Sequence, residues 1–277
     1  LQITSSYVQA SSLKVDSQGN VHIFFYNGVN ESKGLWYANN TAGSWTTSLI
    51  EGTDTSTFFS VGTEPDLFID TSDNLHVVYT RYYKNTANAL MDVVYGNNTG
   101  GSWSFEVAAS GSRFGDGTNL GLDPNGKAHI AFLDNTNFEL HYATNAGGSW
   151  VNSTLASGVE AFYGLSMEVD TKGNSHIGFY DATNGAIGYA NNAGGNWAFT
   201  KVAYVGAASN LCSLALDKGD GVHITYFDAR SASEGLKYST NTAWKLTTLY
   251  DGPITFAPGQ SSIKVDKNGW THVCYYV

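Results

Sequence analysis

One short phrase recurs six times along this chain: an aspartate, five intervening residues, and a histidine that opens an apolar run. The copies are Asp16 with His22, Asp70 with His76, Asp123 with His129, Asp170 with His176, Asp217 with His223, and Asp266 with His272. Successive aspartates are 47 to 54 residues apart. Self-similarity at that period is typical of proteins built from stacked structural units, which bury their apolar faces against their neighbours. The phrase therefore predicts a repeat architecture.

Each complete repeat contains four short apolar segments. In the third repeat these segments are 120–122, 128–133, 139–143 and 150–156. Turn sequences rich in Asn, Gly and Pro separate them, and none has a helical period of useful length. Four short strands in about 40 to 50 residues are typical of a propeller blade. We therefore expect an all-β fold, a six-bladed β-propeller of four-stranded antiparallel blades.

The repeats are expected to form one domain that covers residues 1–277. Their approximate limits are 10–52, 64–109, 117–157, 164–204, 211–251, and 260–277 together with 1–9. The sixth repeat supplies only two strands, so the last blade is expected to be incomplete and closed by an N-terminal strand from residues 2–8. A truncated chain is the alternative explanation for the missing strands, and the first residue, Leu1, suggests a processed or trimmed N-terminus.

The turn before the fourth strand carries a second repeated sequence. Residues 143–150 read Ala-Thr-Asn-Ala-Gly-Gly-Ser-Trp, and similar turns occur at 38–45, 96–103, 190–197 and, shortened, 239–244. This turn resembles the Asp-box of the bacterial neuraminidase repeat, with Asn in the position of Asp. The resemblance implies a sialidase-superfamily-like scaffold but not an activity, because the box is a folding device on a rim remote from that family's active site. We expect the Asn side chain to bond backbone amides of the turn.

The Asp…His phrase is interpreted as a structural turn motif. Ligands of one metal ion must converge within about 2.0–2.2 Å of it, and residues spread around a ring of blades cannot do so. Each histidine is instead expected to bond its own aspartate or the turn backbone. The sequence predicts no metal site and no cofactor, although the turns rich in Asn and Asp leave Ca²⁺ open.

Composition restricts the class of partner and the environment. Charged residues are only 14% of the chain and the net charge is −10, so the basic patch of a nucleic-acid binder is not expected. No apolar run approaches the roughly 18 residues of a membrane span, so membrane insertion is not expected either. A surface rich in Asn, Thr, Ser and Gly favours an extracellular or cell-surface protein. The two cysteines are expected to be buried free thiols, with a bridge between adjacent repeats as the alternative.

Function is expected on the rim opposite the motif turns, where the loops vary between repeats. The candidate ligand-binding residues on that rim are Arg81, Arg113, Arg230, Phe59, Phe114, Tyr163, Asp66, Glu160 and Asp181. Aromatic side chains there could stack on sugar rings or pack between blades. The three arginines invite comparison with the sialidase arginine triad, which grips a substrate carboxylate. However, the chain has no Arg-Ile-Pro sequence near its start and no Tyr–Glu nucleophile pair identifiable by motif, so surface ion pairs are the competing interpretation.

Three functions fit these observations. The first is a secreted or surface-exposed, non-catalytic binding propeller, for carbohydrate or another small polar ligand. The second is a sialidase-like glycoside hydrolase or a polysaccharide lyase. The third is an interaction or structural module of a larger surface protein. Catalytic residues and oligomeric state are not predicted from the sequence.

Overall fold

The computed structural model describes residues 8–29, 33–84, 90–159, 164–206, 212–230, 233–252 and 260–276. These residues form strands and turns, without a helix. This part of the chain therefore has no helix of the length and apolarity that a membrane crossing requires. The predicted all-β class is confirmed, and it follows from short apolar segments alternating with turns rich in Gly and Asn.

The strands form six antiparallel sheets, each from consecutive strands. Sheet 1 contains β1 (Val8–Val15), β2 (Val21–Asn27), β3 (Gly34–Asn39) and β4 (Thr46–Gly52). Sheet 2 contains β5 (Phe58–Ile69), β6 (Leu75–Tyr83), β7 (Leu90–Asn97) and β8 (Ser104–Ser112). Sheet 3 contains β9 (Phe114–Leu122), β10 (Ala128–Asp134), β11 (Glu139–Thr144) and β12 (Val151–Ser157). Sheet 4 contains β13 (Ser166–Val169), β14 (Ser175–Asp181), β15 (Ala186–Asn191) and β16 (Ala198–Tyr204). Sheet 5 contains β17 (Cys212–Leu216), β18 (Val222–Asp228), β19 (Gly235–Thr240) and β20 (Lys245–Tyr250), and sheet 6 contains β21 (Gln260–Val265) and β22 (Thr271–Tyr276).

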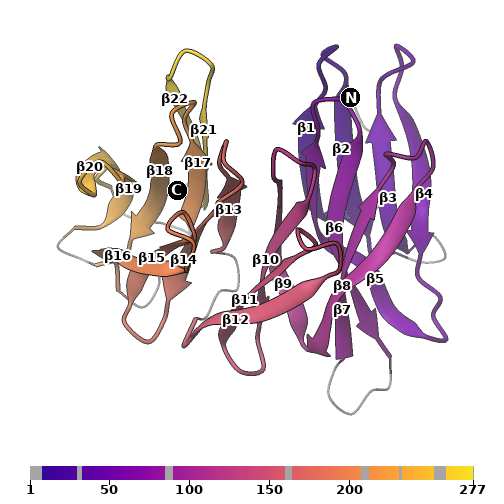
Figure 1. Cartoon of the computed structure of the whole chain (residues 1–277), viewed down its shortest axis with the longest axis horizontal. Coiled ribbons are helices and arrows are strands. Elements are labelled where there is room, and N and C mark those ends of the chain that lie inside the picture. Colours follow the sequence, from indigo (N-terminus) through magenta and orange to yellow (C-terminus); the bar gives the residue numbers. More distant parts are fainter. Residues whose placement is uncertain are drawn as a thin grey trace.

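Apolar side chains fill the spaces between consecutive sheets. Phe24 and Leu35 of sheet 1 cluster with Val61 and Leu67 of sheet 2, and equivalent clusters join sheets 2 and 3, sheets 3 and 4, and sheets 4 and 5. In Figure 1 the sheets follow one another from the indigo and purple strands β1–β4 on the right to the yellow β21–β22 on the left. This succession of sheets packed face to face is the predicted β-propeller architecture.

A row of hydrogen bonds ties the first strands of consecutive sheets together. Each acceptor is the side chain four residues before a motif aspartate, and each donor is a backbone N–H of the next sheet's first strand, at 2.9 to 3.3 Å. The acceptors are Ser12, Asp66, Asn119, Ser166 and Ser213, and the donors belong to Leu67, Leu120, Met167, Leu214 and Ile263. This polar position therefore fastens sheet to sheet.

One face of sheet 1 is uncovered by the residues that the structure describes. Leu13 on β1 is 54% exposed. The corresponding side chains of the other five first strands are at most 5% exposed: Leu67, Leu120, Met167, Leu214 and Ile263. The segment that was expected to close the last blade, residues 2–8, lies outside the described residues except for Val8, which begins β1. Closure by an N-terminal strand stays a prediction.

The repeated histidines belong to hydrogen-bonded chains on one rim. In all six repeats the histidine Nε2 lies 3.2 to 3.9 Å from Oδ2 of its own aspartate. In sheets 1 to 5 the Nδ1 atom contacts a tyrosine hydroxyl of the third strand, from Tyr37, Tyr95, Tyr142, Tyr189 and Tyr238 respectively. The tryptophan that precedes the next sheet's fourth strand packs on that tyrosine in four cases: Trp103 on Tyr37, Trp150 on Tyr95, Trp197 on Tyr142, and Trp244 on Tyr189. In sheets 1, 2, 4 and 5 each imidazole thus has a hydrogen-bond partner on both ring nitrogens, whereas Nε2 of His129 in sheet 3 is too far from Asp123, at 3.9 Å, for a hydrogen bond.

The asparagine of the second turn acts differently from what we expected. The side-chain oxygen of Asn145 accepts from the backbone N–H of Ala128, at the start of β10, and not from an amide of its own turn. Asn40, Asn98, Asn192 and Asn241 make the equivalent bond to the residue that precedes each motif histidine. The two repeated turns are therefore connected by this hydrogen bond. A backbone amide of the second turn is bonded instead by the residue before the asparagine, as when Asn97, which precedes Asn98, accepts from the N–H of Thr99.

Both cysteines are free thiols, but only one is buried. Cys212 lies between sheets 4 and 5, where its thiol donates to the carbonyl of Gly164. Cys274 on β22 is exposed, so the expectation of two buried thiols was wrong for this residue. Sheet 6 has two strands and nothing in the described chain covers its outer face.

Candidate functional site

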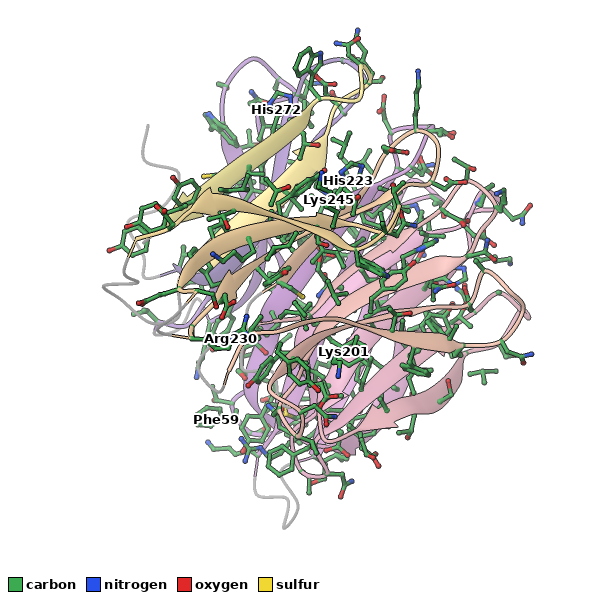
Figure 2. The ribbon with its side chains drawn as sticks, turned by 90° about the vertical axis from the view of Figure 1, so that its left-hand side faces the viewer. Phe59, Lys201, His223, Arg230, Lys245 and His272 are labelled. Carbon is green, nitrogen blue, oxygen red and sulfur yellow. The ribbon has the colours of Figure 1, made fainter. Side chains whose placement is uncertain are left out.

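A pocket of about 180 Å³ opens between sheets 3 and 4 at the end of β14. It lies on the rim of the variable loops. In Figure 2, Arg230 and Phe59 of this rim lie in the lower half of the molecule, opposite the motif residues His223 and His272 in the upper half. The lining residues are Ala156, Ser157, Val159, Phe179, Asp181, Ala186, Ile187, Gly188, Phe199, Thr200 and Lys201.

The pocket exists because sheet 4 carries small residues where sheet 3 carries large ones. In sheet 3, Glu139 and His141 stand on β11; the corresponding positions on β15 are Ala186 and Gly188. At Gly188 the ring of Phe179 comes so close that a Cβ would lie 2.5 Å from it. Phe179 therefore lies low over the sheet and forms the floor of the pocket.

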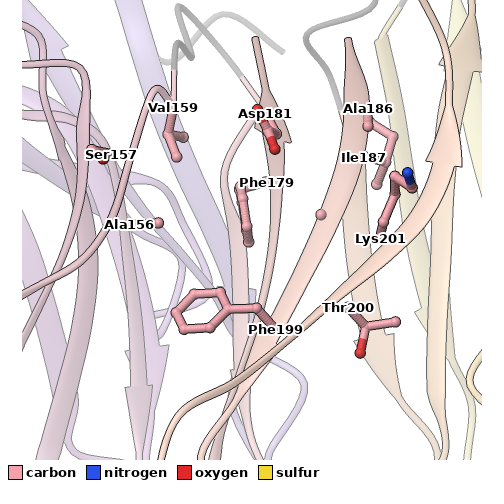
Figure 3. Close-up of a pocket in the computed structure, with 11 residues that line it drawn as sticks. Ala156, Ser157, Val159, Phe179, Asp181, Ala186, Ile187, Phe199, Thr200 and Lys201 are labelled. Carbon is pink, nitrogen blue, oxygen red and sulfur yellow. The ribbon is translucent and has the colours of Figure 1, made fainter. Parts of the chain in front are cut away.

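Apolar and polar groups meet in this pocket. Phe179 is buried, whereas Phe199 on the outer strand is 48% exposed (Figure 3). Asp181 accepts hydrogen bonds from the backbone N–H and side-chain amide of Asn184, which hold its carboxylate at the edge of the pocket. Lys201 donates to the Tyr204 hydroxyl at 2.6 Å and lies over the Tyr204 ring. An aromatic surface beside fixed polar groups is the usual composition of a site for a small polar ligand.

An irregularity in the outer strand sets the position of Lys201. In β16 one residue, Val202, has no partner on β15, since Ile187 pairs with Ala203 and Gly188 with Lys201. The same bulge occurs in sheets 1, 2, 3 and 5. A bulge bends the strand and redirects the side chains beside it. It places Lys201 opposite Gly188 on the pocket face.

The predicted arginines lie apart from one another, and two of them form separate ion pairs. Arg81 forms an ion pair with Glu51, with Nε 2.9 Å from Oε1. Arg230 binds Asp228 through Nε and Nη2, at 2.9 and 2.6 Å. Arg113 is exposed, at the junction of β8 and β9, with a positive φ of 52°. None of the three lines the pocket.

A tyrosine and a glutamate do meet, at a place that sequence motifs did not indicate. The Tyr79 hydroxyl donates to Glu51, which also accepts from Arg81. Tyr79 is fully buried, and this burial, with the charge of Glu51 adding to it, raises the pKa of its hydroxyl. A nucleophilic phenolate needs access to substrate and a lowered pKa. The cluster instead fits a partly buried ion pair that joins sheets 1 and 2.

The other predicted residues have distinct surroundings. Phe114 packs on Phe132 and His141, inside the space between sheets 2 and 3. Asp66 belongs to the row of bonds between first strands. Phe59 is exposed, with Tyr82 5.3 Å away and the Lys33 ammonium 4.8 Å from its ring centre. Tyr163 and Glu160 lie outside the described residues.

Of the predicted candidates, Asp181 lines the pocket, and the sequence analysis missed Phe179, Phe199 and Lys201. The signal was available in the repeats themselves. Aligned on the motif histidine, position 188 is glycine where other repeats have Trp36, Val94, His141 and Lys237. A glycine at a position where the other repeats have larger side chains indicates an opening between sheets.

Comparison with known proteins gives similarity in structure alone. No family model matches the sequence, and no curated protein is similar to it. The NanB sialidase from Streptococcus pneumoniae superposes on 98% of this chain with a TM-score of 0.60 at 12% identity. AofleA from Arthrobotrys oligospora superposes on 96% of this chain, with a TM-score of 0.58 at 14% identity. The matched region is 78% of the length of AofleA. The Aleuria aurantia lectin is a fungal lectin with a six-bladed β-propeller fold and fucose recognition. It superposes on 96% of this chain with a TM-score of 0.57 at 11% identity, and the matched region is 90% of the length of the lectin.

This chain has a sialidase-like β-propeller scaffold. The predicted resemblance is thereby confirmed for the fold. The propeller spans 65% of the length of the NanB sialidase. Because the identities are 11% to 14%, these similarities show the fold alone, and a binding activity has to be argued from the pocket.

Proposed function

We propose that this propeller binds carbohydrate in the pocket between sheets 3 and 4. The observation that carries the proposal is the meeting of Phe179 and Phe199 with Asp181 and Lys201 around one opening of about 180 Å³. A sugar ring has apolar C–H faces and a polar rim of hydroxyls. Aromatic rings match the first and fixed charged groups match the second.

The pocket favours a neutral sugar over an acidic one. It contains one carboxylate, Asp181, and one ammonium group, Lys201. The carboxylate accepts from hydroxyls, and its geometry is fixed by Asn184. The ammonium group is already bonded to Tyr204, so it has less freedom to grip a substrate carboxylate. A volume of about 180 Å³ has room for one sugar ring, with the remainder of a glycan chain in solvent.

The composition of the surface and the fold support an extracellular or cell-surface setting for such a binder. Charged residues are 14% of the chain, and polar uncharged residues take their place on the turns. Among solved structures of similar fold, the Aleuria aurantia lectin recognises fucose. The proposed activity is non-catalytic binding.

A glycan array tests this function. Labelled protein should bind a subset of neutral glycans, and the binding should be inhibited by the corresponding free sugar. Silence across neutral and acidic glycans would refute carbohydrate binding. The sialidase-like hydrolase alternative is tested on the same preparation with fluorogenic sialosides and glycosides, and the lyase alternative with the ultraviolet absorbance of unsaturated uronates. Turnover that is lost in Glu51→Gln would replace our proposal with an enzyme.

A further inference from the structure

Three potential metal ligands converge at the rim of sheet 3, one sheet away from the pocket. Asp134 at the end of β10 and Glu139 at the start of β11 are direct partners across the sheet, and His141 is two residues beyond Glu139 on the same face. The nearest ligand atoms of the three side chains all lie within 4.8 Å of one another. Asp134 and His141 are 2% and 5% exposed, and the side chain of Glu139 is 28% exposed.

Neither carboxylate has a lysine or arginine partner among the described residues. The basic side chain nearest to them there is His141, whose Nε2 lies 3.2 Å from Oε2 of Glu139. In two other sheets a basic side chain lies at or beside the equivalent place. On sheet 2, Arg81 faces Asp92 across the strands. On sheet 5, Asp228 pairs with Arg230. A buried carboxylate and a partly buried one in register repel each other unless a cation or a proton lies between them.

The hydrogen bonds around the cluster orient its ligand atoms. Asp134 accepts from the backbone N–H groups of Thr136 and Asn137 at 2.7 and 3.2 Å, and from the Asn137 side-chain amide at 2.7 Å. These three bonds fix the direction of the carboxylate. The imidazole of His141 stacks on Phe132 and is tilted against Phe114, which hold the ring in place.

The contacts of His141 leave one nitrogen directed at a carboxylate. Its Nδ1 lies 3.3 Å from the side-chain oxygen Oδ1 of Asn152, an acceptor, so this nitrogen carries the proton. In the neutral ring Nε2 then presents a lone pair, and it faces Oε2 of Glu139 at 3.2 Å. Two lone pairs at that distance are the arrangement of two ligands around one ion, since ligands about 2.1 Å from a metal lie about 3 to 4 Å apart. A ligating histidine whose other nitrogen donates to an oxygen is the usual form of such a site.

We infer that Asp134, Glu139 and His141 bind one divalent transition-metal ion of the Zn²⁺ or Mn²⁺ class. One imidazole nitrogen with two carboxylate oxygens suits these ions better than Ca²⁺ or Mg²⁺, which prefer all-oxygen ligand sets. The partly exposed side of Glu139 gives the ion access from solvent, and water completes its coordination. The ion neutralises the carboxylate pair and joins β10 to β11 at the variable-loop rim.

The test uses the full chain freed of metal with a chelator and titrated with Zn²⁺ by calorimetry. We expect one Zn²⁺ per chain with micromolar or tighter affinity, a raised melting temperature, and little binding of Ca²⁺ or Mg²⁺. Substitution of Co²⁺ should produce visible absorption bands. Absence of a stoichiometric Zn²⁺ or Mn²⁺ site in the wild type would overturn the inference.

Two variants and one control assign the site. Glu139→Gln, which keeps the shape of a partly exposed side chain, and His141→Gln should each weaken Zn²⁺ binding at least tenfold and remove the thermal shift. His272→Gln removes an exposed histidine that lies 3.2 Å from Asp266, and should leave the binding unchanged. Melting curves without metal show whether each variant is folded. Unchanged Zn²⁺ affinity in folded Glu139→Gln, or loss of binding in His272→Gln, would place the metal elsewhere and contradict the inference.

Discussion

His176 accepts a hydrogen bond from Tyr189 on the neighbouring strand, with 2.6 Å between Nδ1 and the hydroxyl oxygen. On its other side the same imidazole lies 3.2 Å from Asp170. Burial, reinforced by the negative charge of Asp170, raises the pKa of Tyr189, so the hydroxyl keeps its proton and donates it. The order Asp–His–Tyr resembles a catalytic relay, but its repetition in five sheets makes it a device for holding two strands and a turn together.

Removing the Tyr189 hydroxyl is therefore expected to reduce stability. Tyr189→Phe leaves a buried ring nitrogen of His176 without its donor, which costs about 1 to 3 kcal/mol of unfolding free energy. Urea unfolding measures this value. Tyr275→Phe, at a more exposed tyrosine of sheet 6, is the control and should change it by less than about 0.5 kcal/mol. Equal stability of Tyr189→Phe and the wild type would show that the relay is not stabilising.

Acid is expected to destabilise the propeller in two steps. Burial lowers the pKa of His76 and His129 below 6.5, so the unfolded chain binds protons before the folded one as the pH falls through about 6.5. For Asp170, desolvation raises the pKa, but hydrogen bonds from Asn174, His176 and the backbone outweigh it and lower the pKa to about 2. Its contribution is present above about pH 4 and is lost between about pH 4 and 2. Unfolding free energies measured from pH 8 to 2 should fall in both windows, and Asp170→Asn should make the fall in the lower window smaller, with the other motif aspartates such as Asp16 still contributing to it. A stability that rises on acidification through either window would contradict this assignment.

The uncovered face of sheet 1 is expected to tolerate truncation that its equivalents do not. Leu214→Ala removes a buried side chain between sheets and should cost about 2 to 5 kcal/mol, whereas Leu13→Ala, at the corresponding position of β1, should cost less than about 1 kcal/mol. Chemical denaturation of the two variants provides the comparison. A loss in Leu13→Ala as large as that in Leu214→Ala would mean that Leu13 is covered in solution.

The two thiols are expected to react at very different rates. Burial raises the pKa of Cys212 to about 12, and the thiolate is the reactive form. Ellman's reagent should therefore modify one thiol, Cys274, in the native protein and the second only in denaturant. Modification in Cys274→Ser without denaturant would show that the space between sheets 4 and 5 opens readily.

Glycan binding is expected to depend on the outer-strand aromatic of sheet 4. Phe199→Ala should weaken the affinity for a glycan selected on the array at least tenfold, or about 1.4 kcal/mol, because a stacking surface is lost. Leu246 is the corresponding residue of sheet 5 and is 51% exposed, so Leu246→Ala is a matched control that should bind normally. Calorimetric titration compares the three proteins. Equal affinity in Phe199→Ala and Leu246→Ala would remove Phe199 from the site.

The architecture was predictable because period and turn chemistry are local properties. Six Asp…His phrases and the strand pattern were enough to predict a propeller. Contacts between strands were less accessible to sequence reasoning: Tyr189 was recognised as a strand residue, but not as the partner of His176, and Asn145 was assigned to its own turn although it bonds Ala128. Such pairings depend on the register between strands.

The pocket was harder to predict because it arises from missing side chains. Sequence reasoning favoured charged residues, such as Arg81 and Arg230. Both form ion pairs with carboxylates of this chain, and neither lines the pocket. The opening comes instead from Ala186 and Gly188, at the two positions where sheet 3 has Glu139 and His141. These two positions underlie both proposals, since the small residues of sheet 4 leave room for a ligand and the large residues of sheet 3 can bind a cation.

The most direct measurement of the central claim is a crystal structure of the protein soaked with the glycan that binds best on the array. We predict that a sugar ring lies against Phe179 and Phe199, with a hydroxyl bonded to Asp181. Sugar density at another place, such as over the exposed Phe59 ring beside Tyr82, with an empty pocket between sheets 3 and 4, would contradict the account.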